Sequence, residues 1–378
     1  MVIVAVALMI LGTEKVYSQI KLINNQKQRL TEDFSQLTEQ FNELDKNYQE
    51  LKNTDQIKIN QKLDEDIKII QKNYQDSVKL YERILDISGK SSVLKIQTNW
   101  AEIISLLSKN NYASASGAME KLSVEIKKIE DSAIIAKIPE NLPVKDTPPG
   151  SGLAKQVVET DVGKFVVNII SANLSDTKLV VDTASNGDCK NDCPVLPLAE
   201  FAKRSGAIAA INGPYFCPAT YPSCSDKKNS FDTLLMNKNK TYFNSDNNVY
   251  SSNPVAIFST TSRFVENGSS WGRDTSVDAV IMGRPLLVFN GEVKFFGNND
   301  TKETSRGNRS FLGSSDGTVY IGIVYSATVA ETAKVIAKLG IKNAINLDSG
   351  GSSAFWSNGS YLAGPGRDLP FGILLVRR

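Results

Sequence analysis

Polar residues that could carry out chemistry follow two short apolar strands of the predicted fold. The run AIAAI at residues 207–211 leads into Asn212 and Gly213, and the run NAINL at residues 343–347 leads into Asp348. Open α/β-type sheets commonly bind ligands at the carboxyl ends of their strands. We therefore expect the two strand ends to contribute to a site.

The second strand end combines a carboxylate with groups that could bind an anion. Asn346 and Asp348 share one face of the strand, because side chains alternate with a period of two. An amide in an apolar strand needs hydrogen-bond partners or a ligand, since burying it unpaired is unfavourable. Backbone N–H groups and hydroxyls that could approach an anion follow, at Gly350, Gly351, Ser352 and Ser353. The pattern indicates an acid/base site, although DSGGSS taken alone is more often a turn.

A third segment, TSRGNRSFLG at residues 304–313, places two arginines ahead of an apolar strand. Arg306 and Arg309 could form a guanidinium fork for phosphate, for which arginine is better shaped than lysine. The competing interpretation is a solvated surface loop.

The composition narrows the chemistry further. The 378 residues contain no histidine, which excludes Ser-His-Asp and Cys-His catalysis and ordinary histidine zinc sites. Lys and Arg number 43 against 41 Asp and Glu, so no overall field draws the chain to nucleic acid. We expect a site of carboxylates, hydroxyls, amides and basic side chains, with no cofactor, no assigned metal ligand and no nucleic-acid partner. Metal dependence stays open, and without histidine a metal site would be built from oxygen ligands.

All four cysteines lie in one short stretch, at Cys189, Cys193, Cys217 and Cys224. They fit two disulfides formed in an oxidising compartment. Local pairing would join Cys189 to Cys193 and Cys217 to Cys224, and two other pairings stay open. A zinc site is disfavoured, because the gaps lack the two-residue spacing of structural zinc knuckles.

The chain that positions these residues divides into four parts. Residues 1–17 begin with the apolar run MVIVAVALMILG, which fits a signal-peptide core of about 7–15 residues better than a spanning helix of about 20. This part is predicted as a signal anchor or a truncated transmembrane segment. Residues 18–136 are a coiled-coil and helical region, residues 137–153 a Pro/Gly linker, and residues 154–378 the domain that carries the chemistry. We expect that domain to be extracytoplasmic, either membrane-anchored or secreted.

Heptad seams in residues 18–136 are typical of a coiled coil. Lys27 occupies the one core position of the first seam that is not apolar, and the apolar positions are Ile23, Leu30, Phe34, Leu37, Phe41, Leu44, Tyr48 and Leu51. An interruption at residues 53–55 allows an antiparallel helical hairpin or an interrupted parallel coiled coil between two chains, hence a homo-oligomer. A polar turn at residues 109–112 predicts one further hairpin. The region is interpreted as a spacer.

Beyond the linker, the pattern predicts a mixed-sheet α+β domain. Short β-rich runs such as KFVVNII at residues 164–170 and TVYIGIV at residues 318–324 alternate with Gly, Asn and Asp turns. Helices are predicted at residues 197–204 and 329–339, each followed by a glycine suited to the left-handed position after a helix. The whole chain is predicted as α+β, an all-α stalk followed by a mixed-sheet domain.

Three motifs of this domain resemble, in the same order, the phosphodiester glycosidase family. AIAAINGPYF resembles the family's A-x-x-A-I-N-G-x-F-F segment, and AINLDSGGSSAFW resembles its N-L-D-G-G-G-S-S segment. RGNRSFLGSSDGTVYIGIV resembles its R-x-P-R-T-A-x-G segment and the strand after it. The likeness covers about residues 157–378 and none of the stalk. The family includes proteins like N-acetylglucosamine-1-phosphodiester alpha-N-acetylglucosaminidase and bacterial exopolysaccharide-associated proteins.

This resemblance implies a hydrolase that removes a glycosyl group from a sugar-1-phosphodiester, here in a cell-envelope or extracellular glycan. It implies that Asp348 is a general acid/base or electrostatic stabiliser, that Arg309 neutralises phosphate charge, and that Asn212 orients a hydroxyl or water. The implied substrate-binding positions are Arg306, Asn346, Gly350, Gly351, Ser352, Ser353 and Gly213.

Glycosidases that break the C–O bond use two carboxylates, so a partner for Asp348 is expected. The candidates are Glu331, Asp316, Asp232 and Asp182. The chain also departs from the family pattern, at Pro214, Asn308, Ser310 and Ser349. Pro214 removes a backbone donor and Ser349 restricts the loop, so a different substrate or weak activity is expected.

Two other functions compete with hydrolysis. The first is a non-catalytic carbohydrate- or phosphate-binding module displayed on a coiled-coil stalk. The second is a scaffold in envelope assembly, in which the helical region acts and the C-terminal domain is accessory. The expected partners are a phosphorylated glycan and, through the N-terminal segment, a membrane.

Overall fold

The computed structural model describes residues 2–52, 55–87, 94–132, 141–246 and 250–378. Contacts divide the chain into two compact units, residues 1–72 and residues 73–378. Helices come first and strands follow, which confirms the α+β class. The boundary between these units differs from the linker predicted at residues 137–153. Residues 137–140 of that linker lie outside the described residues. The division of the chain into four parts therefore stays a prediction.

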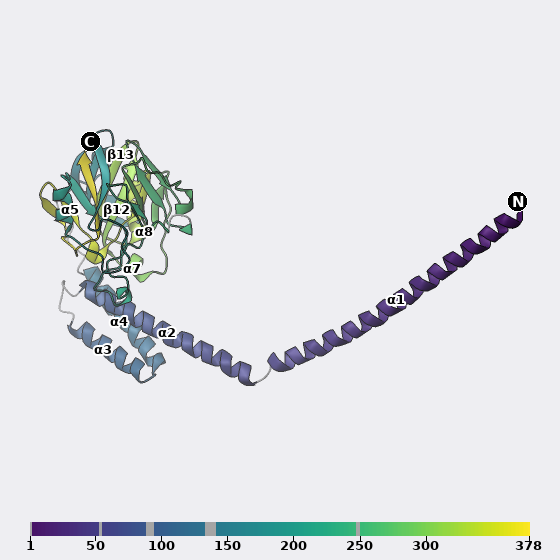
Figure 1. Ribbon diagram of the computed structural model, residues 1–378. Coiled ribbons are helices and arrows are strands. Elements are labelled where there is room, and N and C mark those ends of the chain that lie inside the picture. The colour runs from purple at the N-terminus through teal and green to yellow at the C-terminus, as the bar shows by residue number, and fades with distance from the viewer. Residues whose placement is uncertain (1, 53–54, 88–93, 133–140, 247–249) are drawn as a thin grey trace. The chain divides into compact units, whose positions relative to one another are not determined.

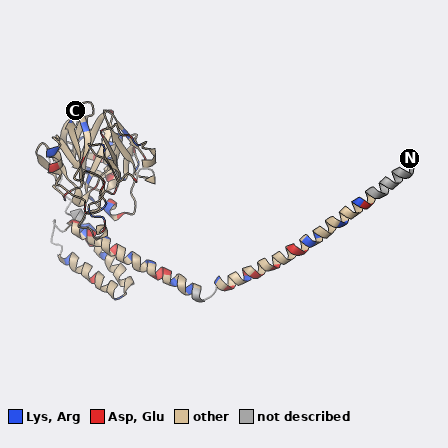
Figure 2. Cartoon of the chain, in the orientation of Figure 1, with Lys and Arg blue, Asp and Glu red and all other residues tan. Residues whose placement is uncertain are grey.

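Helices α1 (Val2–Lys52) and α2 (Asp55–Ile87) form the N-terminal helical region (Figure 1). Charges of both signs are distributed along them (Figure 2). The apolar seam of α1 and the first part of the α2 seam face solvent, with Leu30 70% exposed and Leu63 56% exposed, whereas Ile84 near the end of α2 is buried. Within the described ranges, no helix has an apolar stretch long enough to cross a membrane. Pairing of the stalk with a second chain and the signal anchor stay predictions.

The end of α2 packs against a helical hairpin made of α3 (Leu94–Ser108) and α4 (Tyr112–Ser132). Trp100 donates from its indole Nε1 to the Ser77 carbonyl over 3.1 Å. The apolar core of this bundle is formed by Leu80, Ile84, Ile87, Ile96, Ile103, Leu107, Ala115, Met119, Leu122 and Ile126. The hairpin predicted around residues 109–112 is confirmed, and it fixes one face of the last turns of α2.

Three sheets form the framework of the remaining chain. The seven-stranded sheet has the order β1-β2-β13-β12-β14-β10-β11, with β1 (Gly152–Thr160), β2 (Gly163–Asn173), β13 (Thr318–Ala327), β12 (Gly307–Ser315), β14 (Asn343–Asn346), β10 (Leu286–Phe289) and β11 (Glu292–Val293). One five-stranded sheet has the order β16-β15-β4-β17-β3, with β16 (Ser360–Ala363), β15 (Phe355–Ser357), β4 (Ala209–Asn212), β17 (Phe371–Arg377) and β3 (Thr177–Thr183). The other has the order β6-β5-β9-β7-β8, with β6 (Tyr242–Phe243), β5 (Leu235–Met236), β9 (Ala279–Met282), β7 (Val255–Phe258) and β8 (Ser262–Val265).

The strands of these sheets pair antiparallel, where a mixed sheet was expected. The reason is local: hairpins such as β1–β2 and β12–β13 join consecutive strands directly, and a tight connection reverses the chain direction. The connections carry helices α5 (Leu198–Arg204), α7 (Thr301–Thr304) and α8 (Val329–Lys338) and the 3-10 turns η1 (Pro222–Cys224), η2 (Gly268–Ser270) and η3 (Gly350–Ser352).

Two apolar layers cover opposite faces of the seven-stranded sheet. On β2, Val167 and Ile169 belong to the layer beneath α8, whereas Ile170 and Ala172 belong to the core shared with the first five-stranded sheet. This change of face follows from the two-residue period of a strand. The sheet is thus buried on both sides, which fixes the register of β14 and therefore the position of the loop after it.

The two helix–glycine–strand units predicted from the sequence are confirmed. Gly206 follows α5 with φ +62° and Gly340 follows α8 with φ +76°, both left-handed. Their strands, β4 and β14, lie in different sheets. The site is therefore formed where the ends of two sheets meet.

Candidate functional site

The ends of β4 and β14 are joined through the Asn212 side chain. Its Nδ2 donates to the Asp348 carbonyl over 2.7 Å, and its Oδ1 accepts from Ser310 Oγ at 2.8 Å and from the Ala354 N–H at 3.2 Å. The Asp348 N–H in turn donates to the Gly213 carbonyl over 3.1 Å. Asn212 is completely buried. Its amide is used in holding the two strand ends together, so it positions Asp348.

Asp348 lies partly buried in the loop after β14. Burial raises the pKa of its carboxyl from 3.8 to about 6, and hydrogen bonds from the Ser352 side chain and the Ser349 backbone N–H, the latter 2.8 Å long, oppose that rise. A carboxyl with this pKa exchanges its proton close to neutral pH. That property suits a general acid or base.

The Nδ2 of Asn346 finds the partners that an amide in an apolar strand needs, whereas its Oδ1 is buried with no hydrogen-bond partner among the described residues. Its Nδ2 donates to the Tyr215 hydroxyl at 2.8 Å and to the Arg284 carbonyl at 3.1 Å. The Arg284 guanidinium lies 4.9 Å from the centre of the Tyr215 ring. Burial, and then the charge of Asp348, raise the pKa of Tyr215, so its hydroxyl stays protonated. Tyr215 and Arg284 are site residues that the sequence analysis missed, although NGPYF contains the tyrosine.

The two arginines predicted for phosphate are engaged by the protein itself. Arg309 is 6% exposed, and it donates from Nε to the Ala327 carbonyl at 3.0 Å and from Nη2 to the Lys302 carbonyl at 2.8 Å. Arg306 contacts the Glu331 carboxylate and donates to the Ser326 carbonyl at 2.9 Å. Their substrate-binding roles stay predictions. In this structure both guanidinium groups hold the connections around α7 and α8 in place.

The predicted glycines and serines lie in and beside η3. Gly350 has φ +64°, and a Cβ on Gly351 would lie 2.3 Å from Nη2 of Arg367. Gly213 allows a similarly close approach, because a Cβ there would lie 2.3 Å from the Phe371 ring. Ser353 donates to the Asn308 carbonyl at 3.3 Å, whereas Ser352 binds Asp348. Of these hydroxyls, only Ser352 acts on the carboxylate.

Arg367 is the basic residue that η3 brings to Asp348, and the sequence analysis missed it. Its backbone N–H donates to the Gly351 carbonyl at 2.9 Å, and its positive charge favours the ionised form of Asp348. Among the described residues, its Nη1 is buried without a hydrogen-bond partner. The available signal was the Gly-Pro-Gly turn at residues 364–366 directly before it.

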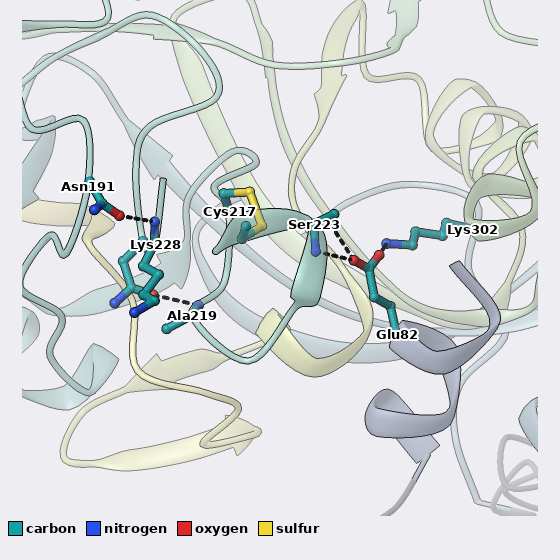
Figure 3. The surroundings of a disulfide bond; sticks show 9 residues. Glu82, Asn191, Cys217, Ala219, Ser223, Lys228 and Lys302 are labelled. Atoms are coloured by element: carbon teal, nitrogen blue, oxygen red, sulfur yellow. Dashed lines mark hydrogen bonds and ion pairs between the residues drawn. A yellow bond between two sulfur atoms is a disulfide. The ribbon is translucent and has the colours of Figure 1, made fainter. Parts of the chain in front are cut away.

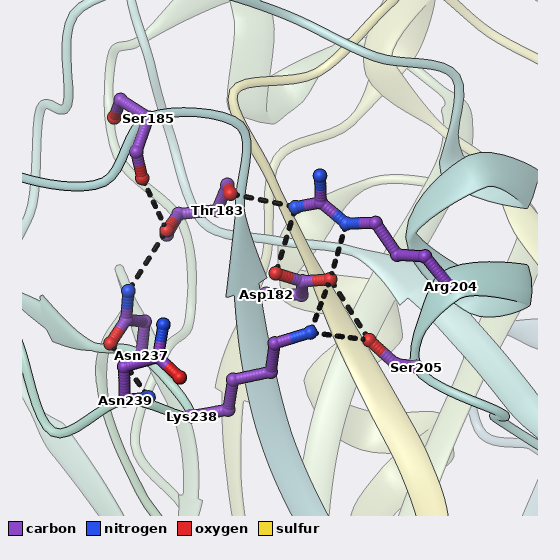
Figure 4. A network of polar contacts seen from close by, with 8 residues as sticks. All are labelled: Asp182, Thr183, Ser185, Arg204, Ser205, Asn237, Lys238 and Asn239. Carbon is purple, nitrogen blue, oxygen red and sulfur yellow. Dashed lines mark hydrogen bonds and ion pairs between the residues drawn. The ribbon is translucent and has the colours of Figure 1, made fainter.

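Three of the four candidates for a second carboxylate are engaged away from the site. Asp182 accepts from Arg204 Nε at 2.7 Å, from Ser205 Oγ at 2.9 Å and from Lys238 Nζ at 3.0 Å (Figure 4). Glu331 caps α8 by accepting from the Thr328 N–H at 2.8 Å. Asp316, in an exposed turn, pairs with Lys342 at 2.7 Å.

Asp232 is the candidate that lies beside the site. Its N–H donates to the Tyr215 carbonyl at 3.3 Å. Burial raises the pKa of its carboxyl, while the charges of Lys227, Arg284 and Lys302 lower it. Arg284 thus lies near both Asp232 and Tyr215, and the role of Asp232 as the second carboxylate stays a prediction.

Helix α2 brings two carboxylates, Glu82 and Asp86, into contact with side chains of the domain, and Figure 3 shows the contacts of Glu82. Asp86 accepts from the Tyr221 hydroxyl and from Arg367 Nη2, each at 2.6 Å. Glu82 contacts the Ser223 hydroxyl and accepts from Lys302 Nζ at 3.3 Å. The charge of Asp86 also raises the pKa of Asp348. The end of α2 therefore lies within electrostatic reach of the Asp348 carboxyl.

The four cysteines form the two local disulfides, Cys189–Cys193 and Cys217–Cys224. The second closes the loop that carries Tyr221 and Ser223. In the part of the chain that the structure describes, no cluster of three or more Cys, Asp or Glu side chains is arranged to hold a metal ion. The prediction of two disulfides is confirmed, and the open choice of pairing is resolved as local.

Residues 205–376 match the sequence model of the phosphodiester glycosidase family. No curated protein matches the chain at a significant level. The catalytic domain of zebrafish N-acetylglucosamine-1-phosphodiester alpha-N-acetylglucosaminidase, auto-inhibited by its pro-peptide, is similar in structure, with 16% identity, a TM-score of 0.49, and 63% of this chain and 87% of that chain covered. A hypothetical protein from Synechocystis is similar with 13% identity and a TM-score of 0.43 over 60% of this chain. The match spans 62% of the Synechocystis chain, which is less than two thirds of its length.

Proposed function

Because the C-terminal domain of this chain belongs to the phosphodiester glycosidase family, we propose that it hydrolyses a sugar-1-phosphodiester, releasing the sugar and leaving the phosphate on its partner. The observation that carries this proposal is the Asp348 carboxyl. It lies where two strand ends meet, and its pKa is about 6. A carboxyl that still holds a proton near neutral pH can protonate a leaving oxygen.

The proposed reaction breaks the bond between the anomeric carbon and the phosphate oxygen. Asp348 gives its proton to that oxygen, which leaves with the phosphomonoester. Asp232 accepts a proton from a water molecule whose oxygen attacks the anomeric carbon. Asn212 and Asn346 position the loop of Asp348 and the Tyr215 hydroxyl through the contacts described above.

We place the substrate in a cell-envelope or extracellular glycan. Two disulfides within the domain support an extracytoplasmic location, because such bonds persist in oxidising compartments. In this proposal the helical region is a spacer, and its exposed seams pair with a second copy of the chain. Anchoring to a membrane through residues 1–17 is part of the same proposal.

The test is a screen of the purified full chain against synthetic sugar-1-phosphodiesters, with released sugar and phosphomonoester both measured. The same chain with Asp86→Asn is assayed in parallel, since that change weakens the contact between α2 and Arg367. We expect turnover in at least one of the two backgrounds. Adding Asp348→Asn to that background should lower it about a thousandfold, because the general acid is lost.

Asp316→Asn is the matched control, since it makes the same chemical change in an exposed turn. It should leave turnover within about twofold of its parent, as expected for a surface site that touches no substrate. No release of sugar in either background across a broad panel would overturn the proposed reaction. It would favour the alternative, a non-catalytic module that binds a phosphorylated carbohydrate.

A further inference from the structure

Four donor groups converge on the two carboxylates of α2 from segments outside the three sequence motifs that resemble the family, and one of them, Arg367, also acts on Asp348. Tyr221 and Ser223 come from the loop closed by the Cys217–Cys224 disulfide, Lys302 from α7, and Arg367 from the turn after β16. All four contact a carboxylate of α2 and therefore already hold anionic oxygens. Figure 3 shows two of them, Ser223 and Lys302, on Glu82.

The Tyr221 ring organises this group of donors. Lys302 Nζ lies 4.5 Å from the ring centre and the Arg367 guanidinium 5.0 Å from it, so the ring carries two cations. Burial, and then the charge of Asp86, raise the pKa of Tyr221, so that its hydroxyl remains a donor. A guanidinium, an ammonium and two hydroxyls are the donors that proteins use for phosphoryl oxygens.

One of these donors still has capacity for a ligand. Arg367 uses Nη2 for Asp86, whereas its Nη1 is buried and has no partner among the described residues. A buried, unpaired donor is unfavourable, and a ligand oxygen would relieve it. Nothing in the three motifs accounts for that donor.

We propose that Arg367, Tyr221, Lys302 and Ser223 form a binding site for the phosphoryl group of the substrate and product, and that Asp86 and Glu82 of α2 occupy it as an internal competitor. This inference rests on the proposed function for the identity of its ligand. It assigns phosphate binding to Arg367. It also adds a competitor, the two carboxylates of α2, that phosphate must displace.

The construction of α2 supports the role of competitor. Glu82 and Asp86 are four residues apart and thus share one face of the helix. The opposite face, with Leu80 and Ile84, is packed into the core formed with α3 and α4. Both carboxylates are therefore presented by a rigid element. A ligand that must displace them binds more weakly, in proportion to the fraction of molecules in which the site is open.

The experiment measures the binding of inorganic phosphate to the purified full chain by titration calorimetry at pH 7.5. Glu82→Gln together with Asp86→Asn keeps the shape of both side chains and removes their charges. We expect this double variant to bind phosphate about tenfold more tightly than the wild type, because the competitor is weakened. Asp76→Asn is the matched control, since Asp76 pairs with Lys79 within α2 and should leave phosphate affinity unchanged.

Adding Arg367→Met to the double variant should abolish the gain, as should Lys302→Met, whose half-exposed side chain makes it the safer change for folding. Equal affinity in wild type and double variant would overturn the proposal, and so would a gain that survives both removals. The calorimetric measurement of phosphate binding does not depend on catalytic turnover, so the two proposals can fail separately. Binding as expected with no sugar released would count against the reaction alone, and sugar release with no gain in affinity would count against the internal competitor alone.

Discussion

Asp182 and Asp348 are both withdrawn from solvent in the same domain, yet their surroundings push the two carboxyls in opposite directions. Burial raises the pKa of Asp182, but hydrogen bonds from Arg204, Lys238 and Ser205 outweigh it, and the net pKa lies below the ordinary value (Figure 4). At Asp348 burial dominates, and the pKa rises to about 6. The difference lies in the number and charge of the donors, since two cations touch Asp182 directly.

This contrast separates a carboxylate held in ion pairs from one that can exchange a proton near neutral pH. The Asp182 ion pairs tie β3 to the end of α5 and to the segment around Lys238, far along the chain from one another. Asp348 receives two hydrogen bonds from its own loop, from Ser349 and Ser352, which leave it able to take up and release a proton. Both aspartates were candidates on sequence grounds, and only the partners distinguish them.

The largest effect on stability is expected from Asp182→Asn, which leaves Arg204 and Lys238 without their carboxylate partner. Because the carboxylate is buried but both cations are partly exposed, the change should lower the free energy of unfolding by about 3 kcal/mol at pH 7, the low end of the range for buried ion pairs. Because the folded pKa is lowered, the wild-type advantage is present above the ordinary Asp pKa of about 3.9 and is lost as the pH falls through the folded value. Urea unfolding from pH 7 to pH 3 checks this. If the difference in unfolding free energy between wild type and Asp182→Asn did not shrink as the pH falls, the variant would have lost packing and not the ion pair.

The opposite effect on the free energy of unfolding, an increase, is expected for Asp348→Asn. The folded pKa is raised, so wild-type Asp348 destabilises the fold increasingly as the pH rises from about 4 through 6, and the neutral amide avoids this penalty. The variant should be more stable than the wild type by about 2 kcal/mol at pH 7.5 and equal to it near pH 4. The same urea series measures both pH values. A less stable variant at pH 7.5 would contradict the raised pKa.

The smallest effect is expected from Ser352→Ala. This change removes a hydrogen bond to the Asp348 carboxyl and leaves Asp348 itself in place. The ionised form loses a donor, so the pKa should rise by about 0.7 unit, the equivalent of one hydrogen bond of about 1 kcal/mol. If Asp348 acts as the acid, the upper limb of the pH profile of kcat/KM should move up by that amount. Ser353→Ala is the control, because that hydroxyl binds the Asn308 carbonyl. An equal shift in both variants would assign the effect to the loop as a whole.

The sequence predicted those parts of the site that depend on local pattern. The glycines after α5 and α8 and the apolar strands after them located Asn212 and Asp348 correctly at two strand ends. The apolar strand also predicted that the Asn346 amide needs partners, which its Nδ2 finds in the Tyr215 hydroxyl and the Arg284 carbonyl. These predictions succeed because helix caps and strand faces are determined within a few residues.

The missed residues are those that only tertiary structure brings in. Asp86 and Arg367 are separated by 281 positions, and nothing in the heptad pattern marks Asp86 as more than one charge on a solvated helix. The motif could locate Arg309 but could not show that its guanidinium donates to the Ala327 and Lys302 carbonyls, and its role toward phosphate stays a prediction. The choice of Asp232 over Asp182 likewise required knowledge of which cations lie nearby.

Gly351 and Arg367 also constrain how this sequence can diverge. Any side chain at 351 would begin 2.3 Å from the guanidinium, and any side chain at 213 would begin 2.3 Å from the Phe371 ring. The guanidinium is the far end of a flexible side chain and can move aside, whereas the Phe371 ring is fully buried and can yield only if the core repacks. Among related chains, a small residue at 371 should therefore be the condition for losing glycine at 213, while a side chain at 351 should displace the arginine from its present position.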